Sequence, residues 1–254
     1  MPLEVVVVPC RTDNYAYLLR DTASGRVGLV DAPEAGPIAA ALAARGWGLH
    51  TILLTHRHDD HIAGVAELVA GFGAEVTGPA GEKGMPPLDR AVAEGDTVAL
   101  GESRATVLDV PGHTLGHIAY HFADAEALFS ADSLMVMGCG RVFEGTLPQM
   151  WQSLAKMAAL PDTTMVYSGH EYAEGNLRFA LSVDAANPAL QARAAEIAAL
   201  RKNGAPTVPA LLGLERQTNP FLRVVDPGFK AGLGLSGSSD AQVFAEVRRR
   251  KDSF

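Results

Sequence analysis

Cysteine is scarce in this chain: of its 254 residues, only Cys10 and Cys139 are cysteines. Two cysteines cannot form the disulfide framework of a small secreted protein, and they favour a reducing compartment such as the cytoplasm. The first residues, MPLEVVVVPCRTDNY, lack the basic start and the cleavage site of a signal peptide. No apolar run reaches the ~18 residues that indicate a membrane span. We therefore expect a cytoplasmic protein without a membrane anchor.

Basic residues are too few for a general nucleic-acid-binding protein. Lys and Arg total 21 against 29 Asp and Glu, which gives a net charge of -8. The segment RRRK, residues 248–251, is a local exception. It can place cations at a helix C-terminus, where the helix dipole favours them, or it can hold an anionic ligand.

The chain has enough apolar residues for a sizeable core. Hydrophobic residues make up 48% and charged residues 20%, as in an ordinary globular protein. Runs rich in Val, Leu and Tyr predict strands, and periodic Ala- and Leu-rich stretches predict helices. We expect strands at 3–8, 15–20, 26–31, 51–55, 74–79, 96–100, 104–109, 117–122, 127–130 and 164–169, and helices at 33–48, 62–73 and 150–160.

The character of the chain changes near residue 172. Several hairpin-like links between the earlier strands argue against a pure βαβ repeat, whereas the later segments look helical. Asn187 before Pro188 is typical of a helix start, and Ser239 with Gln242 fits a capping box. The pattern predicts a mixed α/β body over residues 1–171 and a helical part over residues 172–254.

The segment THRHDDHIAG concentrates potential metal ligands where a strand gives way to a helix. His56 and His58 alternate along extended chain, so their side chains can converge on one point. Asp60 and His61 are adjacent, so they diverge from that pair and can address a neighbouring point. Imidazole and carboxylate groups suit Zn, Fe or Mn, and the lack of thiolates argues against a structural cysteine-type zinc site.

Three further donors each follow a strand-like run. They are His113 in LDVPGHTLGH, Asp132 in LFSADSLM and His170 in MVYSGHEY. A sheet would present these side chains along one edge. Together with the first cluster, they predict a metal site built from several segments.

These motifs carry a resemblance to known proteins. THRHDDH, PGHTLGH, ADS and GHEY, in this order, resemble the metallo-β-lactamase-fold hydrolases. The segments RTDNYAYLL, GCGRVFEGT, SGHEYAEGNLRFA, TNPFLR and VRRRKDSF resemble glyoxalase II, the hydroxyacylglutathione hydrolase family, from residue 12 to 254. The resemblance implies an α+β fold: a four-layer αββα sandwich, residues 1–171, followed by a helical substrate-binding domain, residues 172–254.

The resemblance also implies a centre of two divalent metal ions, with zinc as the first expectation and iron or manganese as alternatives. One ion would be bound by His56, His58 and His113. The other would be bound by Asp60, His61 and His170. Asp132 would bridge the two ions and, with them, hold the hydroxide that attacks the substrate.

The implied reaction is hydrolysis of S-(2-hydroxyacyl)glutathione, such as S-D-lactoylglutathione, to glutathione and D-lactate, the second step of methylglyoxal detoxification. A thiolate leaves without strong acid help, which agrees with the lack of a general acid in the motifs. Substrate binding would fall to Arg141, Phe143, Tyr172, Arg248 and Lys251. Phe143 stands where the family often has Tyr. We expect no nucleic-acid or membrane partner, and a monomer.

Other functions remain open at this point. An iron-dependent glutathione persulfide dioxygenase of the same fold would use one iron, two histidines and a carboxylate. A non-catalytic metal-binding module is the alternative outside enzymes. A β-lactamase or lactonase would not account for the Arg248 and Lys251 pair, and an RNA-processing nuclease is disfavoured by the net charge.

Some candidate residues keep two interpretations. His117 either supports a metal ligand by hydrogen bonding or packs in the core. Asp31 either orients a ligand or caps the next helix. His50 and His121 are expected to be structural or surface residues.

Overall fold

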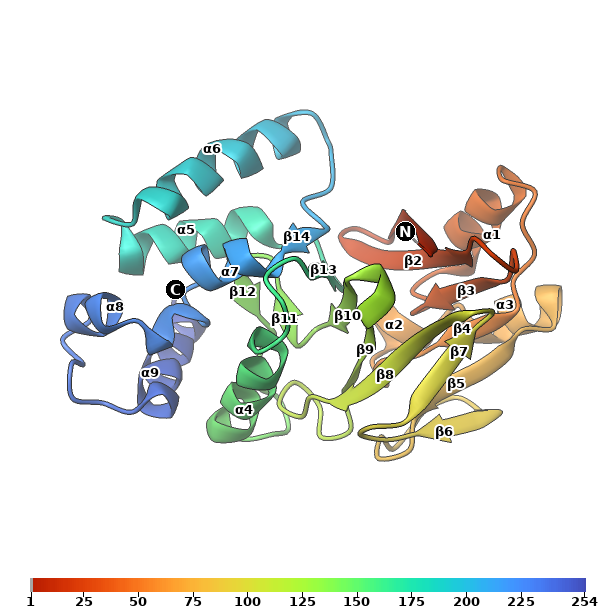
Figure 1. Cartoon of the computed structure of the whole chain (residues 1–254), viewed down its shortest axis with the longest axis horizontal. Helices are drawn as coiled ribbons and strands as arrows, with labels where there is room; N and C mark the ends of the chain where they lie inside the picture. The colour runs from red at the N-terminus through yellow and green to blue at the C-terminus, as the bar shows by residue number, and fades with distance from the viewer. Residues whose placement is uncertain (1) are drawn as a thin grey trace.

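Two six-stranded sheets form the centre of the computed structural model, which describes residues 2–254 (Figure 1). The first sheet contains, in spatial order, β1 (Leu3–Cys10), β2 (Asn14–Asp21), β3 (Val27–Val30), β4 (Thr51–Leu53), β5 (Glu75–Pro79) and β6 (Arg90–Val92). The second contains β14 (Ala210–Leu211), β13 (Met165–Ser168), β10 (Ala127–Ala131), β9 (Ile118–Phe122), β8 (Ser103–Asp109) and β7 (Thr97–Leu100). A separate hairpin pairs β11 (Leu134–Met135) with β12 (Gly138–Cys139).

Strand direction follows from the length of the connections. β1, β2 and β3 are joined by short turns and pair antiparallel, whereas β3, β4, β5 and β6 pair parallel across longer connections. In the second sheet β7 to β10 are antiparallel, and β13 returns parallel to β10. The mixture of hairpins and crossovers is the one predicted from the sequence.

The helices lie on the outside of the sheets and at one end of the molecule. They are α1 (Ala35–Ala43), α2 (Asp59–Ile62), α3 (Val65–Phe72), α4 (Leu147–Ala158), α5 (Ala173–Asp184), α6 (Pro188–Lys202), α7 (Leu212–Thr218), α8 (Pro227–Gly232) and α9 (Asp240–Asp252), with short 3-10 turns η1 (Ala123–Ala125) and η2 (Arg223–Val225). Helices α5 to α9, drawn in teal to blue, gather on the left of Figure 1. Among residues 2–254, no helix is long and apolar enough to cross a membrane.

Alternate side chains of each strand enter different cores. On β9 and β10, Tyr120 and Phe129 point between the two sheets, while Ala119 and Leu128 face the helices on the other side. The first sheet does the same, because Leu19 enters the central core and Leu18 packs with Ile38 of α1. Both sheets are therefore covered on both faces, which confirms the predicted αββα sandwich with a C-terminal helical region.

The expected helix over 62–73 is wrong in its start. The chain forms α2 at Asp59, breaks, and starts α3 at Val65. The break occurs at Gly64. Its N–H donates to the carbonyl of Ala32 (2.8 Å), so the main chain at Gly64 lies close to the main chain before α1. A Cβ at Gly64 would lie 2.8 Å from the nitrogen of Ala35, so only glycine permits this approach.

The helix expected over 33–48 is also shorter, since α1 ends at Ala43, and the one expected over 150–160 starts earlier, at Leu147, whereas the predicted caps of the later helices are confirmed. Asn187 caps α6, and Ser239 with Gln242 forms the capping box of α9. Short elements without a strong pattern were missed: β6, β11, β12, β14, α7 and α8.

Replacing Phe129 by Ala tests the central core. Its ring is fully buried between the sheets and contacts the rings of Tyr17, Phe122 and Tyr167. We expect F129A to lower the free energy of unfolding by about 3–5 kcal/mol in denaturant titrations. Phe72→Ala is the control, because Phe72 is 37% exposed, and its cost should stay below about 1.5 kcal/mol. Equal losses in the two variants would contradict this description of the core.

Candidate metal centre

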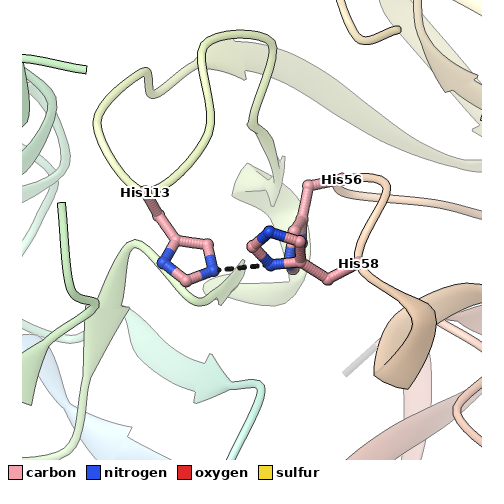
Figure 2. A group of neighbouring side chains, drawn as sticks. All are labelled: His56, His58 and His113. Atoms are coloured by element: carbon pink, nitrogen blue, oxygen red, sulfur yellow. Dashed lines mark hydrogen bonds between the residues drawn. The ribbon is translucent and has the colours of Figure 1, made fainter. Parts of the chain in front are cut away.

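The candidate ligands come from loops that meet at one edge of the sandwich. His56 and His58 follow β4, and Asp60 and His61 lie on α2. His113 lies in the loop between β8 and β9, Asp132 directly follows β10, and His170 follows β13. Figure 2 shows that His56, His58 and His113 turn their rings toward one another although they come from two distant segments. The structure thus brings together all the residues that the sequence predicted as ligands.

His56, His58 and His113 form the first group. Nδ1 of His58 lies 3.1 Å from Nε2 of His56 and 2.9 Å from Nε2 of His113. His56 and His113 are buried, and His58 borders the opening. Three imidazole nitrogens around one point can bind a single cation.

Asp60, His61 and His170 form the second group, and their ligand atoms lie within 4.8 Å of one another. Oδ2 of Asp60 is 3.3 Å from Nε2 of His170 and 3.9 Å from Nε2 of His61. The step from extended chain to α2 after His58 sends Asp60 and His61 away from the first group. This is the division into two points that the sequence predicted.

Asp132 lies between the two groups. Its Oδ2 is 3.3 Å from Nε2 of His113 in the first group and 3.3 Å from Nε2 of His170 in the second. Its Oδ1 is 3.4 Å from Nε2 of His61. The preceding residue, Ala131, has a φ of 41°, an unusual value for a residue with a side chain, and it turns the carboxylate out of the strand.

Carboxylates outside the centre hold two of the histidines in the second group. Nδ1 of His61 lies 2.7 Å from Oδ2 of Asp31, and Nδ1 of His170 lies 2.9 Å from Oδ1 of Asp13. An N–H that donates to these carboxylates leaves Nε2 of each ring free to bind a cation. Asp31 also accepts from the N–H and hydroxyl of Thr55, so both its oxygens are occupied. Asp31 contacts His61 and does not cap α1, whose N-cap is Glu34, so the structure supports the orienting interpretation.

In the first group, the Nδ1 atoms of His56 and His113 contact uncharged oxygen atoms instead of carboxylates. Nδ1 of His113 lies 2.9 Å from the carbonyl oxygen of Arg141, and Nδ1 of His56 lies 3.0 Å from the hydroxyl of Thr55. Both rings therefore present Nε2 to the centre, whereas His58 presents Nδ1.

The other histidines lie outside the centre. His117 is fully buried and stacks on the ring of His56 at 4.6 Å, and within residues 2–254 neither of its nitrogens has a hydrogen-bond partner. Packing, not hydrogen bonding, is therefore the interpretation that the structure supports for His117. His50 accepts from the N–H of Val27, and His121 lies half-buried on β9.

Two buried polar atoms in the centre fit a bound cation. Within the described part of the chain, Nε2 of His61 and Oδ1 of Asp132 face each other at 3.4 Å without forming a hydrogen bond, and neither has another hydrogen-bond partner. Buried polar atoms are rarely left in this state, because an unmade interaction is costly. Imidazole and carboxylate donors suit zinc, iron and manganese. The residues present therefore fit a divalent metal.

Nearby charged groups and burial shift the pKa values of Asp132 and of histidines in the centre. Burial alone would lower the pKa of His61 and His170, but Asp132 and the neighbouring carboxylates outweigh it and raise these pKa values to about 10 and about 11. Burial lowers the pKa of His56 and His113. Burial would raise the pKa of Asp132, but the adjacent His61 and His170 lower it well below its usual range.

The centre opens into a cavity of about 330 Å3, here called the entrance pocket. The predicted substrate-binding residues all line it: Arg141, Phe143, Tyr172, Arg248 and Lys251. Tyr172 stacks on the ring of His170 at 4.7 Å, and Phe143 lies 5.3 Å from the ring of His113. Both aromatic residues are substantially exposed at the opening.

Arg248 and Lys251 share one face of α9 at the entrance pocket. Arg248 is buried and donates to the carbonyl of Cys139 (3.2 Å) and to Asp252 (2.8 Å). Nζ of Lys251 donates to the carbonyl of Gly175 (3.2 Å). Burial, followed by the charge of Arg248, lowers the pKa of Lys251.

Sequence reasoning missed three residues that shape the site. Asp13 and Asn14 lie in the motif RTDNY but were given no role, and Asn14 donates to Oδ2 of Asp60 (3.1 Å). Asp252 follows the basic cluster and offsets part of its charge. The sequence signal for these three residues was their position within the motifs RTDNY and VRRRKDSF, because Asp and Asn occur throughout the chain and their residue type alone did not single them out.

Fold and centre together define a class. Residues 12–170 match the model of the metallo-beta-lactamase superfamily. ETHE1 from Myxococcus xanthus is 25% identical with a TM-score of 0.70, over 98% of this chain and 90% of that one. TTHA1623, solved in a di-iron-bound form, is 25% identical with a TM-score of 0.62, over 86% of this chain and 100% of that one. The chain has the metallo-β-lactamase fold.

The particular family follows from the rest of the chain. Residues 171–254 match the model described as hydroxyacylglutathione hydrolase C-terminus. Proteins named hydroxyacylglutathione hydrolase from Cereibacter sphaeroides and Ruegeria pomeroyi are each 57% identical over 255 residues, covering 100% of both chains. The chain belongs to the hydroxyacylglutathione hydrolase family.

Metal binding should weaken as the pH falls. His61 and His170, with pKa values of about 10 and about 11, carry protons at neutral pH in the metal-free protein and must lose them to bind a cation. We expect release of up to about two protons per chain at pH 7 and rising affinity toward pH 10. Calorimetric titration with Zn²⁺ in buffers of different ionisation enthalpy measures this release. A binding enthalpy that is independent of the buffer would contradict it.

Proposed function

We propose that this protein hydrolyses the thioester of S-(2-hydroxyacyl)glutathione, such as S-D-lactoylglutathione, to glutathione and a 2-hydroxy acid, D-lactate for this substrate. One observation carries the proposal: Asp132 lies between two groups of ligands at the floor of a pocket whose wall holds Arg248 and Lys251. The names of the full-length relatives support the same activity.

In this proposal the two groups bind two divalent metal ions. His56, His58 and His113 would hold one, Asp60, His61 and His170 would hold the other, and Asp132 would offer its carboxylate to both. Zinc is the first expectation, and iron or manganese also suits these donors. When bound, such ions would lower the pKa of water enough to provide a hydroxide near neutral pH and would offer Lewis-acid stabilisation to the thioester carbonyl.

The protein's own residues bind and orient the substrate. Glutathione carries two carboxylates, and Arg248, Lys251 and Arg141 provide cations at the entrance pocket of an otherwise acidic protein. Tyr172 and Phe143 offer apolar surface on either side of the ligand groups. The leaving thiolate, with a conjugate acid of pKa ~8.5, needs no proton donor at the site.

The competing functions fit the centre less well. A persulfide dioxygenase with one iron would use two histidines and one carboxylate, a set that Asp60, His61 and His170 alone provide, and it would leave the group of His56, His58 and His113 without a role. A structural metal site is normally closed by four ligands, whereas this centre borders an open pocket. The hydrolase therefore accounts for more of the site.

The setting of this activity is also proposed. We place the enzyme in the cytoplasm as a monomer, with residues 1–171 as the metal-binding domain and residues 172–254 as the domain that completes the substrate site. Its partner is a small glutathione thioester, with no nucleic acid or membrane.

Thiol release from S-D-lactoylglutathione tests the activity. Metal-free protein should be inactive, and added Zn²⁺, Fe²⁺ or Mn²⁺ should restore turnover. Asp132→Ala should lower kcat roughly 100-fold or more, because the shared carboxylate is lost. His121→Ala, on β9 and outside the centre, is the control and should keep full activity. Equal thiol release by metal-free and metal-loaded protein would reject the assignment.

Substitution of the two cations tests the glutathione site. Arg248→Ala and Lys251→Ala should each raise KM roughly 10- to 100-fold, the value of a charge-assisted hydrogen bond, and should leave bound metal unchanged. Arg249→Ala is the matched control, since this exposed neighbour pairs with Glu246 instead of facing the entrance pocket. Loss of metal in the Arg248 or Lys251 variant would show that their role was misassigned.

A further inference from the structure

A buried turn follows Asp132 in the chain and leads to Cys139 and Gly140, which line the entrance pocket. In the β11–β12 hairpin Leu134 pairs with Cys139 and Met135 with Gly138, which leaves a two-residue turn whose second residue is Met137. The φ of Met137 is 59°, in the left-handed region that residues with side chains rarely adopt. The turn is fully buried, so its backbone polar groups need partners inside the protein.

Helix α7 supplies the partner for the strained residue. Glu215 is completely buried, and its Oε2 accepts the N–H of Met137 at 2.8 Å. Asn219, one helical turn further on, donates to the same Oε2 at 3.0 Å. The sequence separation of 78 residues between Glu215 and Met137 makes this contact a link between the sheet region and the C-terminal helices.

Side-chain amides of two asparagines in the C-terminal helical part contact backbone carbonyls of the hairpin. Nδ2 of Asn219 lies 2.9 Å from the carbonyl of Gly138 and 3.2 Å from that of Met135. Nδ2 of Asn176, on α5, donates to the carbonyl of Val136 (3.0 Å). Glu215 is the one carboxylate among these contacts, and it holds the N–H at the residue of positive φ.

The second strand of the hairpin leads directly into the pocket. The carbonyl of Cys139 accepts from Arg248 (3.2 Å), and the N–H of Gly140 donates to the carbonyl of Ser133 (3.2 Å). The carbonyl of Arg141, two residues after Cys139, accepts from His113 (2.9 Å), which anchors the main chain at that point. A shift of the turn would therefore move the carbonyl of Cys139 that holds Arg248 in the entrance pocket.

We propose that Glu215 is a positioning residue for the glutathione site: it holds the Met137 turn and thereby sets Arg248 against the substrate. The proposal rests on the proposed function, because it assigns Arg248 to the substrate. Helix α7 would then contribute to substrate binding although none of its residues lines the entrance pocket.

Glutamine is a close structural substitute for the buried Glu215 side chain. Burial raises the pKa of Glu215 to about 7, so the neutral form of the side chain is accessible in the native structure. A glutamine has the same shape, carries no charge and retains one carbonyl oxygen that accepts the N–H of Met137. Alanine removes that acceptor and leaves the buried N–H unpaired.

The test compares Glu215→Ala, Glu215→Gln and Asp226→Ala. Asp226 caps α8 in the same helical region through the N–H of Phe229 and does not touch the hairpin, so its variant controls for a general loss of stability. KM and kcat for S-D-lactoylglutathione, bound metal, melting temperature and backbone hydrogen exchange of residues 134–140 are measured for each.

We expect E215A to raise KM about tenfold, with a smaller change in kcat and with metal retained. Exchange over residues 134–140 should become faster. E215Q should restore KM to within about twofold of the wild type, and D226A should lower the melting temperature without a change in KM. An unchanged KM in E215A, or a KM in E215Q as high as in E215A, would overturn the proposal.

A failure of the proposed thioesterase function and a failure of the proposed role of Glu215 give different results. A wild-type protein without thioesterase activity would reject the proposed function alone. The role of Glu215 at the turn would then be decided by hydrogen exchange: unchanged protection of residues 134–140 in E215A would reject it, and lost protection that returns in E215Q would support it.

Discussion

The centre depends on the position of one carboxylate, that of Asp132, between two groups of imidazoles. Its two oxygens lie 3.3–3.4 Å from nitrogens of both groups. The approach is close enough that a Cβ at Gly169 would collide with Asp132 and would lie 2.7 Å from Cε1 of His61. A glycine before His170 and a positive φ before Asp132 are therefore local departures that let two neighbouring strands deliver ligands to one place.

The two ligand groups are chemically unequal. The group with Asp60 is backed by the carboxylates of Asp31 and Asp13, whereas the all-histidine group is backed by a hydroxyl and a backbone carbonyl. Carboxylate support makes an imidazole more basic, so negative charge is concentrated on one side of Asp132. The cationic wall of Arg248 and Lys251 adds the opposite charge at the entrance pocket, where the proposed function places an anionic substrate.

Local periodicity explains what the sequence could predict. Alternation along extended chain separated His56 and His58 from Asp60 and His61, and the structure places these pairs in two groups, although His61 also lies within reach of His56 and Asp31. The supporting residues could not be found in that way, because Asp13 meets a histidine 157 positions away and Glu215 meets a turn 78 positions away. The 3-residue β6 and the 6- and 7-residue helices α8 and α7 are likewise too short for a periodic signal. Their places depend on tertiary packing.

Anomalous diffraction from crystals of the active, metal-loaded enzyme is the most direct measurement of the central claim. The account predicts two metal peaks, one on each side of the Asp132 carboxylate, with His56, His58 and His113 around one and Asp60, His61 and His170 around the other. A single peak, or a pair of peaks without Asp132 between them, would contradict it.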